Sequence, residues 1–558
     1  MRRRMRWAAI AASTAAALVL AGCAGIPTGG PVGSVAIDAE DGDGKLLTLP
    51  DSPQKGATPE QILAGFLRAQ RAPQGNYSIA REFLTEEFRL EWSPTELVRV
   101  SDSPIVPQQD GGEASLRVNV NVQASVDATG VYTELPHPES QELAYEFARD
   151  DDGEWRIARA PAGTVLSSRG FDMTFLPYPL YFFDPSGTAL VPDVRWFPDT
   201  ASRADRIVKQ LLAGPAPWYR QGVLVTSFPS GTTLDPGVTI SGGTATVELS
   251  AGVASEDADA LWRMQQQLRS SLVALSEVKD VRMVAGGFPV QVGEGRAAES
   301  AFVVGTDPVG LAEGGFGHLT ASTVDPLPGL SNPIDDLGAT GATVGRGDDM
   351  AAVRTQAGAW LVRPGEDPLL VDGRPGVIDP SIDAQGFVWS AVGADADSII
   401  AVDASGQAHA LPAPNLDGAI VSLDVSRDGT RLLIGTQGAG GPGLTIAGIV
   451  RDGDGVPTGF GDPLRLAITS ATLLDATWVD SSTVAALSRD GEATEVDAYG
   501  IGGRHESLGQ LAGGVQIVGG NFVEGIRVRD DDGAVWRRSS TGSWLSTGIV
   551  ASFLATQQ

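Results

Sequence analysis

The chain has 558 residues and a formal net charge of −29 at pH 7. This excess of negative charge argues against nucleic acid or anionic lipid as a binding partner. The length is too great for one hydrophobic core and predicts three or four domains. The 70 glycines and 35 prolines predict many short elements joined by turns, with a C-terminal half that is mostly β.

The N-terminus has the pattern of an export signal. Arginines at positions 2, 3, 4 and 6 precede an uncharged stretch, Ala8–Leu20, which is too short to span a bilayer. It ends at Leu20-Ala21-Gly22-Cys23, which resembles the lipobox of bacterial lipoproteins. The resemblance implies cleavage between Gly22 and Cys23, and a Cys23 that carries an S-diacylglycerol and an N-acyl group. Two or three acyl chains would anchor the mature protein stably.

Two other interpretations of this segment are less favoured. An ordinary secretory signal would make the cysteine accidental, but exported proteins often pair their cysteines in disulfides, and Cys23 is the only cysteine in the chain. An uncleaved transmembrane anchor needs about 20 apolar residues, which no stretch supplies. Cys23 is therefore predicted to be an acyl acceptor.

Residues 23–54 are rich in glycine, proline and aspartate and show little apolar periodicity. This composition predicts a flexible tether between the membrane and the folded part.

The first folded unit is predicted at residues 55–170. Thr58-Pro59-Glu60-Gln61 is a capping box that begins a helix, and a second amphipathic helix is expected at Tyr77–Leu90. Apolar and polar residues alternate over Leu116–Gln123, as in a half-buried strand. Two helices followed by antiparallel strands resemble the α+β roll of nuclear transport factor type. No polar constellation for catalysis is evident, so a structural or docking module is expected.

The second unit is predicted at residues 199–297, after an aromatic and proline-rich connector at 171–198. Helices are expected at Asp199–Ala213 and along the stripe from Leu261 to Leu275, with strands at Val223–Phe228, Thr244–Leu249 and Val278–Val284. The stripe is typical of a helix packed into a core. This layout, with Ile207–Pro215, Phe228–Thr232 and Thr246–Ser250, resembles the spore-germination GerMN domain. The resemblance implies an envelope scaffold or a ligand-binding module.

Residues 298–558 are predicted to form a β-propeller. A loose repeat ends in turns at Gly386 and Gly429, recurs at Arg529–Trp536, and is degenerate at Ala476–Val484. The first two turns are about one propeller blade apart, which predicts about six blades. A pair of β-sandwiches could give similar turns.

No site for chemistry emerges from the sequence. His137, His318, His409 and His505 are isolated, so neither a metal nor a cofactor is predicted. The glycine-rich stretch Gly438–Gly443 matches a dinucleotide fingerprint only formally, because it lies between strands and opens no helix. The chain is therefore predicted not to be an enzyme, although a pair of catalytic carboxylates is left open.

The order of these parts resembles the LpqB lipoprotein family of actinobacteria. The resemblance implies a lipoprotein on the outer face of the cytoplasmic membrane. It also implies association with the sensor region of the MtrB histidine kinase, and thereby modulation of MtrAB signalling, cell division and envelope homeostasis. The alternative is a protein that binds cell-wall glycan or peptide, possibly a hydrolase, through the central pocket of the propeller.

Replacing the acyl acceptor tests the lipobox. We expect Cys23→Ala to abolish labelling by a radioactive or clickable fatty acid and to release the protein from membranes, because no other cysteine can take its place. Continued labelling of the variant would contradict the prediction.

Overall fold

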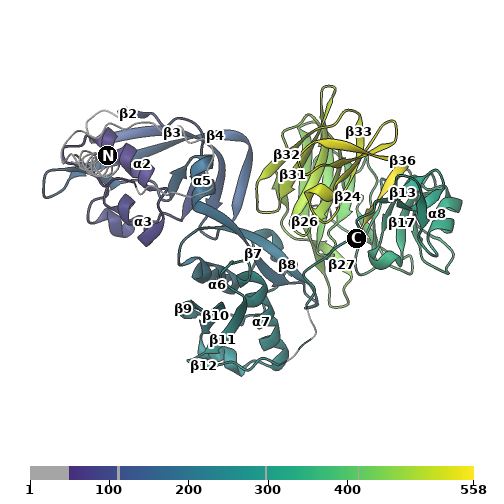
Figure 1. The fold of residues 1–558 in the computed structure, drawn as a ribbon, viewed down its shortest axis with the longest axis horizontal. Helices are drawn as coiled ribbons and strands as arrows, with labels where there is room; N and C mark the ends of the chain where they lie inside the picture. The colour runs from purple at the N-terminus through teal and green to yellow at the C-terminus, as the bar shows by residue number, and fades with distance from the viewer. Residues whose placement is uncertain (1–49, 110–113, 294, 296–297, 413) are drawn as a thin grey trace, which may run out of the picture. The chain divides into compact units, whose positions relative to one another are not determined.

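A computed structural model describes residues 50–558 except 110–113, 294, 296–297 and 413 (Figure 1). The signal, Gly22, Cys23 and the tether up to residue 49 lie outside the described residues. Among the described residues, no helix combines the length and the apolar character needed to cross a bilayer.

The N-terminal unit begins with helix α2, Pro59–Ala69, which the capping box starts as predicted. The Thr58 side chain accepts the backbone N–H of Gln61, and the Gln61 side chain accepts that of Thr58 at 3.0 Å. The single helix expected at Tyr77–Leu90 is instead two short helices, α3 (Gln74–Arg81) and α4 (Phe88–Glu91). The turn between them carries Phe83 and Leu84 into the core.

A mostly antiparallel sheet packs on these helices. The strand order is β5-β4-β3-β1-β6, with β2 added beside β3 and only the β1–β6 pair parallel. In β3 every second residue is buried, as the alternation in the sequence predicts. The strands are β1 (Leu97–Val100), β2 (Pro107–Gln109), β3 (Ser115–Asp127), β4 (Tyr132–Arg149), β5 (Trp155–Arg159) and β6 (Thr164–Leu166).

The stretch 171–198 is not the connector that the sequence suggested. Helix α5 (Ser168–Thr174) leads into a long hairpin of β7 (Phe175–Phe183) and β8 (Leu190–Pro198). This hairpin shares the core of the second unit. Its aromatic residues are therefore buried packing groups, and prolines are tolerated because the hairpin pairs with no further strand of a larger sheet.

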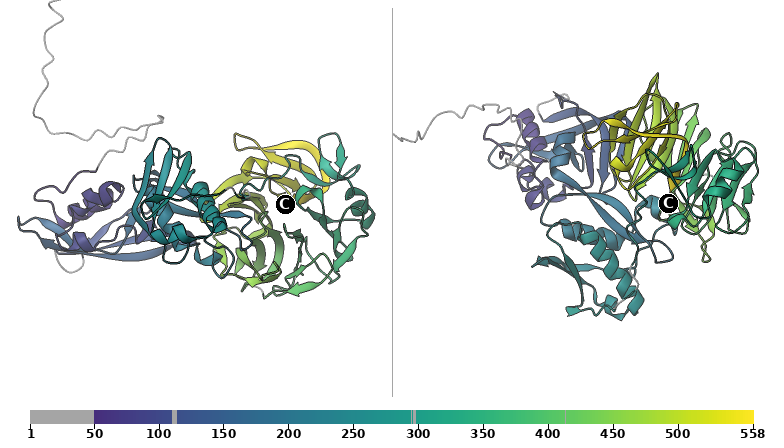
Figure 2. Two further views of the ribbon diagram at one scale, coloured as in Figure 1. Left: turned by 90° about the horizontal axis from the view of Figure 1, so that it is seen from below. Right: turned by 45° about the vertical axis from the view of Figure 1, so that its right-hand side comes forward.

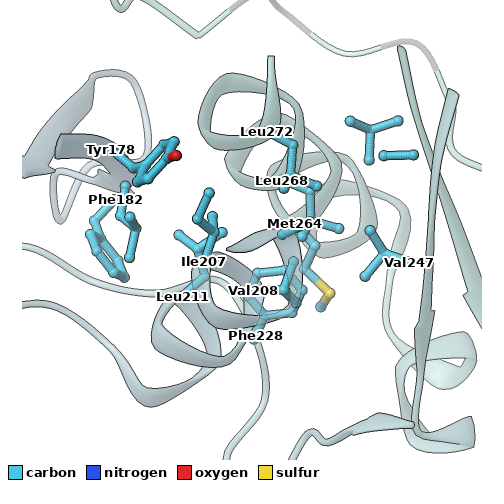
Figure 3. Packing of buried hydrophobic residues seen from close by; sticks show 14 of the residues in the cluster. Tyr178, Phe182, Ile207, Val208, Leu211, Phe228, Val247, Met264, Leu268 and Leu272 are labelled. Atoms are coloured by element: carbon cyan, nitrogen blue, oxygen red, sulfur yellow. The ribbon is translucent and has the colours of Figure 1, made fainter. Parts of the chain in front are cut away.

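The second unit packs two helices and this hairpin against one face of a mixed sheet of order β12-β11-β10-β9 (Figure 3). The predicted stripe places Met264, Leu268 and Leu272 in the core, facing Val208 and Phe228. Residues 223–228 are irregular rather than a strand. The elements are α6 (Arg203–Ala213), η1 (Pro217–Tyr219), β9 (Leu234–Ser241), β10 (Thr244–Leu249), η2 (Ala251–Ser255), α7 (Ala258–Leu272), β11 (Asp280–Ala285) and β12 (Phe288–Pro289).

The C-terminal unit is a β-propeller of six blades arranged in a ring, and we call the region enclosed by their inner strands the channel (Figure 2). Strand β36 (Trp544–Gln557) connects three blades, because residues 544–550 pair with β35, residues 551–555 pair with β13, and Thr556 and Gln557 pair in parallel with β16. This pairing closes the ring.

The blades are numbered in chain order from β16, with the innermost strand first. Blade one is β16 (Gly341–Val344), β17 (Ala351–Thr355), β18 (Gly358–Val362) and β19 (Leu369–Asp372); blade two is β20 (Ser381–Ile382), β21 (Val388–Ser390), β22 (Ile400–Val402) and β23 (Ala408–Ala410). Blade three is β24 (Ala419–Val425), β25 (Arg431–Gly438) and β26 (Gly441–Arg451) with β27 (Pro457–Phe460) and β28 (Leu464–Leu466); blade four is β29 (Thr472–Asp480), β30 (Thr483–Asp490), β31 (Ala493–Gly500) and β32 (His505–Gln510). Blade five is β33 (Gly514–Val518), β34 (Arg527–Asp530), β35 (Ala534–Arg538) and the start of β36; blade six is the end of β36 with β13 (Val309–Ala312), β14 (Gly315–Leu319) and β15 (Val324–Pro326). Helix α8 (Ser331–Leu337) and the 3₁₀ turns η3 (Arg346–Asp348) and η4 (Val523–Gly525) complete the unit.

The sequence repeat corresponds to one kind of turn used at two places in a blade. In the turn after β20, the Asp383 carboxylate accepts the N–H of Phe387 and the indole N–H of Trp389, each at 2.9 Å. Asp530 does the same for Ala534 and Trp536, at 2.8 Å each. The Asp530 turn, however, joins the second and third strands of blade five. The third copy of the repeat is therefore out of register with the others.

One buried ion pair joins the second unit to the propeller. Arg431 of β25 pairs with Asp428, and its guanidinium donates to the Tyr219 hydroxyl at 3.2 Å and the Ser481 carbonyl at 2.8 Å. It also lies 4.6 Å from the centre of the Trp478 ring.

The backbone approaches closely beside this ion pair. A Cβ on Gly448 of β26 would stand 2.6 Å from Cγ1 of Val223, so only glycine fits at this contact. The second unit and blade three thus pack directly against each other.

The turn before β32 joins the propeller to the N-terminal half. The Trp196 indole donates to the Gly502 carbonyl at 2.8 Å, and Arg504 pairs with Asp172 at 2.7 Å. The Arg504 guanidinium lies 5.1 Å from the centre of the Phe171 ring, within the range of cation–π attraction.

Breaking the Arg431 ion pair should destabilise the propeller. Arg431→Met keeps much of the side-chain volume but leaves the buried Asp428 carboxylate without its counter-charge, which typically costs about 3–5 kcal/mol. The measurement is the free energy of unfolding by denaturant. The double variant D428N/R431M should recover part of the loss, and a single variant as stable as the native chain would contradict this account.

Candidate functional site: the central channel of the propeller

Of the neighbouring inner strands, β36 and β16 pair in a short parallel ladder, and hydrogen bonds from one inner strand to the next join the six blades into a ring. We call this set the channel ring. Its bonds are Thr343 Oγ1 to Pro380 O (2.8 Å), Val425 N to Ser381 Oγ (3.0 Å), Trp478 N to Asp424 Oδ2 (2.9 Å), Ile517 N to Asp475 Oδ2 (2.9 Å), Leu554 N to Gln516 Oε1 (2.9 Å) and Gln558 N to Val344 O (3.0 Å). The ring uses side chains of five inner strands, and one bond between backbone groups completes it.

Asp424 is the most heavily used carboxylate of the channel ring. Besides the Trp478 N–H, it accepts the Thr477 hydroxyl at 2.9 Å and the Gln558 amide at 3.1 Å. The residue is only 4% exposed. Burial raises the pKa of Asp424 to about 6, although these hydrogen bonds oppose the shift.

Asp475 links blade four to blade five. One carboxylate oxygen accepts the Ile517 N–H, and the other accepts the Ala476 N–H at 2.9 Å. Burial, together with the negative charges of Asp379 and Asp424, raises the pKa of Asp475 to about 7, although its backbone hydrogen bonds oppose the shift. Near neutral pH the channel therefore holds fewer negative charges than its carboxylates suggest.

A buried arginine crosses the channel where the inner strands end. Arg427 donates to the carbonyls of Val479 at 3.2 Å, Gly520 at 2.6 Å and Gln557 at 3.4 Å. Burial lowers the pKa of Arg427. Arg427 of blade three thus contacts the inner strands of blades four and six. It also contacts the segment that follows the inner strand of blade five.

These contacts show what the channel can do chemically. Asp424 and Asp475 are bound to backbone N–H groups of the next blade, which suits them to hold the ring together rather than to transfer protons to a substrate. The nearby Trp389 and Trp478 are buried between blades, at 0% and 2% exposure. Neither indole ring is therefore available to contact a ligand beside the carboxylates of the channel.

The structure keeps the histidines apart. His505 contacts Glu134, His409 lies 3.7 Å from Asp403, His318 lies 3.6 Å from Asp348, and His137 is exposed in β4. Among residues 50–558 as described, no three histidine, cysteine or acidic side chains are close enough to hold a metal ion. Gly438–Gly441 is the turn of the β25–β26 hairpin.

The sequence did not identify the channel carboxylates as a group. Asp424 and Asp475 are separated by about one blade along the chain, and only ring closure brings their blades side by side. A weak signal exists, because each is an acidic residue with apolar neighbours on both sides within a strand, after Leu423 and after Leu474.

Three family models together match most of the chain. They are the LpqB N-terminal domain at residues 52–172, the sporulation and spore germination domain at 179–291, and the LpqB beta-propeller domain at 314–550. The second match begins within β7, as expected if the hairpin belongs to that unit.

Curated relatives carry the name Lipoprotein LpqB. The chain is 30% identical over 483 residues to the protein of Mycolicibacterium smegmatis, covering 78% of this chain and 79% of the relative. It is 31% identical over 301 residues to that of Thermobifida fusca, covering 51% and 47%. The chain spans about half the length of this relative and of the Cutibacterium acnes protein, of which 46% is covered.

A solved structure resembles part of the chain weakly. The tandem GerMN domains of the sporulation protein GerM from Bacillus subtilis match at 17% identity and a TM-score of 0.19, over 34% of this chain and 59% of that one.

The channel carboxylates should make stability depend on pH. Folding raises the pKa of Asp424 and Asp475 from 3.8 to about 6 and 7. Between these limits the folded chain holds protons that the unfolded chain has lost, so the free energy of unfolding should fall as pH rises from about 4 to about 7.

Asp475→Asn should flatten this dependence in denaturant titrations at pH 5, 6, 7 and 8. Asp403→Asn is the matched control, because hydrogen bonds, chiefly from Ser405, hold the pKa of that partly exposed carboxyl below its usual value. Its contribution is complete at pH 5 and lost only in stronger acid. Equal slopes in the native chain and the Asp475 variant would contradict the assignment.

Proposed function

Because the chain belongs to the LpqB family of lipoproteins, we propose that it is an accessory protein that binds the sensor domain of the MtrB histidine kinase. It acts from the extracytoplasmic face of the cell membrane, where Cys23 anchors it by lipid. Through this contact it modulates MtrAB two-component signalling and thereby cell division and envelope homeostasis.

The observation that supports binding rather than catalysis is that the polar groups of the propeller channel are bonded to neighbouring blades. The channel ring and Arg427 commit the buried polar groups there to joining blades. What the fold offers a partner is therefore its outer surface, held rigid by these bonds. A stable protein–protein contact needs about 800 Å² on each partner, which a propeller of this kind can supply.

The lipid anchor would favour the same partner. A protein tethered to the membrane by residues 23–54 shares a thin layer of space with the ectodomain of a membrane kinase. Its effective concentration there would be far above its average concentration, so a modest intrinsic affinity would suffice. The negative charge of the chain further disfavours adhesion to anionic lipid.

The test is binding of purified, lipid-free Ala24–Gln558 to the extracytoplasmic domain of the cognate kinase at physiological salt, by calorimetry or interferometry. We expect saturable binding and a changed rate of MtrA phosphorylation when both proteins are reconstituted in vesicles. A folded chain that neither binds nor changes this rate would contradict the proposal.

Three exposed apolar side chains allow the binding unit to be identified. Leu90 in the N-terminal unit, Phe288 in the second unit and Phe522 in the propeller are 83%, 76% and 56% exposed. Replacing each by serine should leave the fold intact, since each contributes little to the core. We expect one of the three to weaken kinase binding markedly, with the other two as its controls.

A further inference from the structure

A cavity of about 600 Å³ lies between the second unit and the propeller, apart from the central channel. Its walls come from the β7–β8 turn, from Trp262 of α7, from the segment with Glu299 and Phe302, and from the turns that follow β16, β20 and β24. This volume is within the range of small-molecule sites, about 300–1,000 Å³.

The charged groups of this cavity are each compensated by the protein itself. Arg346 forms a two-pronged ion pair with Glu299, and this contact raises the pKa of Arg346. Asp428 is paired with Arg431. Asp184 accepts the backbone N–H groups of Thr188 at 2.9 Å and Ala189 at 2.7 Å. A charged ligand would therefore meet no unpaired opposite charge among the described lining residues.

What the cavity offers is apolar surface beside uncharged polar groups. Trp262 is held in place by Phe183, with ring centres 6.3 Å apart, and by the backbone of Gly295 against its indole. Phe302 adds a second aromatic side chain. The Gln385 side chain is exposed at the tip of its turn and makes no hydrogen bond to any described residue, so its donor and acceptor are both available.

We propose that this cavity binds a neutral saccharide. A sugar ring has an apolar face for Trp262 or Phe302 and hydroxyl groups that can both donate to and accept from the Gln385 amide. It also carries no charge that would have to leave water without a counter-ion. The site is distinct from the channel, and it is independent of kinase binding.

The test is calorimetric titration of lipid-free Ala24–Gln558 with three probes of similar size. These are the β-1,4-linked trimer of N-acetylglucosamine, maltotriose, and trigalacturonate as an anionic counterpart. We expect saturable binding of at least one neutral trimer and weaker binding of the anionic one. Absence of binding by both neutral trimers to folded protein, or tighter binding of the anion, would overturn the proposal.

Two variants place the binding in the cavity. Gln385→Ala, by losing one hydrogen bond, and Trp262→Phe, by reducing the aromatic surface, should each weaken binding of the neutral trimer by about three- to tenfold. Trp262→Phe keeps an aromatic ring against Phe183 and so preserves the fold. Gln407→Ala, at the exposed outer turn of the same blade, is the matched control and should have no effect. Unchanged affinity in both cavity variants would overturn the proposal.

Kinase binding by the same variants separates the two proposals. Because Gln385 and Trp262 line the cavity, both variants should bind the kinase ectodomain as the native chain does. Loss of saccharide binding with kinase binding intact supports the cavity assignment. Failure of kinase binding in the native chain contradicts only the proposed function.

Discussion

The channel ring is the constraint on which the propeller depends. Backbone ladders hold each blade together, but most neighbouring inner strands do not form a ladder with one another, so the joints between blades need other groups. Asp424, Asp475 and Gln516 supply three consecutive joints by accepting backbone N–H groups of the next blade. A carboxylate can satisfy a buried N–H strongly, at the cost of being desolvated itself. This desolvation is the main reason why the pKa values of the two aspartates are raised.

At the contacts between units, too, a single polar side chain makes several interactions. Arg431 serves an ion pair, a tyrosine hydroxyl and a carbonyl at once, while Arg504 combines an ion pair with an aromatic surface. These contacts are buried or partly buried and specific in direction, unlike a general apolar interface. They hold the unit of residues 50–558 together, which supports a role in presenting a surface to a partner.

The sequence predicted features that depend on neighbours along the chain. The capping box at Thr58, the alternation in β3 and the stripe of α7 are all local patterns, and the structure has each of them. Turn residues also revealed the propeller, because an aspartate that accepts two N–H groups and a glycine with positive φ reverse the chain wherever they occur. Because such a turn forms at any place in a blade, the Asp530 turn looks in the sequence like a copy of the Asp383 turn.

What the sequence did not reveal depends on residues far apart. The hairpin β7–β8 seemed a connector because strands that bury most residues show no alternation and contain prolines. The single helix expected at 77–90 was broken because tertiary packing of Phe83 outweighs local propensity. The channel and the cavity combine residues from several blades, and no local pattern marks such a set.

Strand β36 has a consequence for how the propeller folds. Val309 pairs with Ala555, so blade six cannot form until residues from opposite ends of the propeller sequence have met. Each of the other blades consists mainly of neighbouring hairpins and can form locally. Bringing distant residues into contact has a large cost in loop-closure entropy, and folds that depend on such contacts generally form slowly. Ring closure is thus the step of highest contact order in this unit, and until it occurs the inner strands of blades one and six expose unpaired edges open to association with other chains.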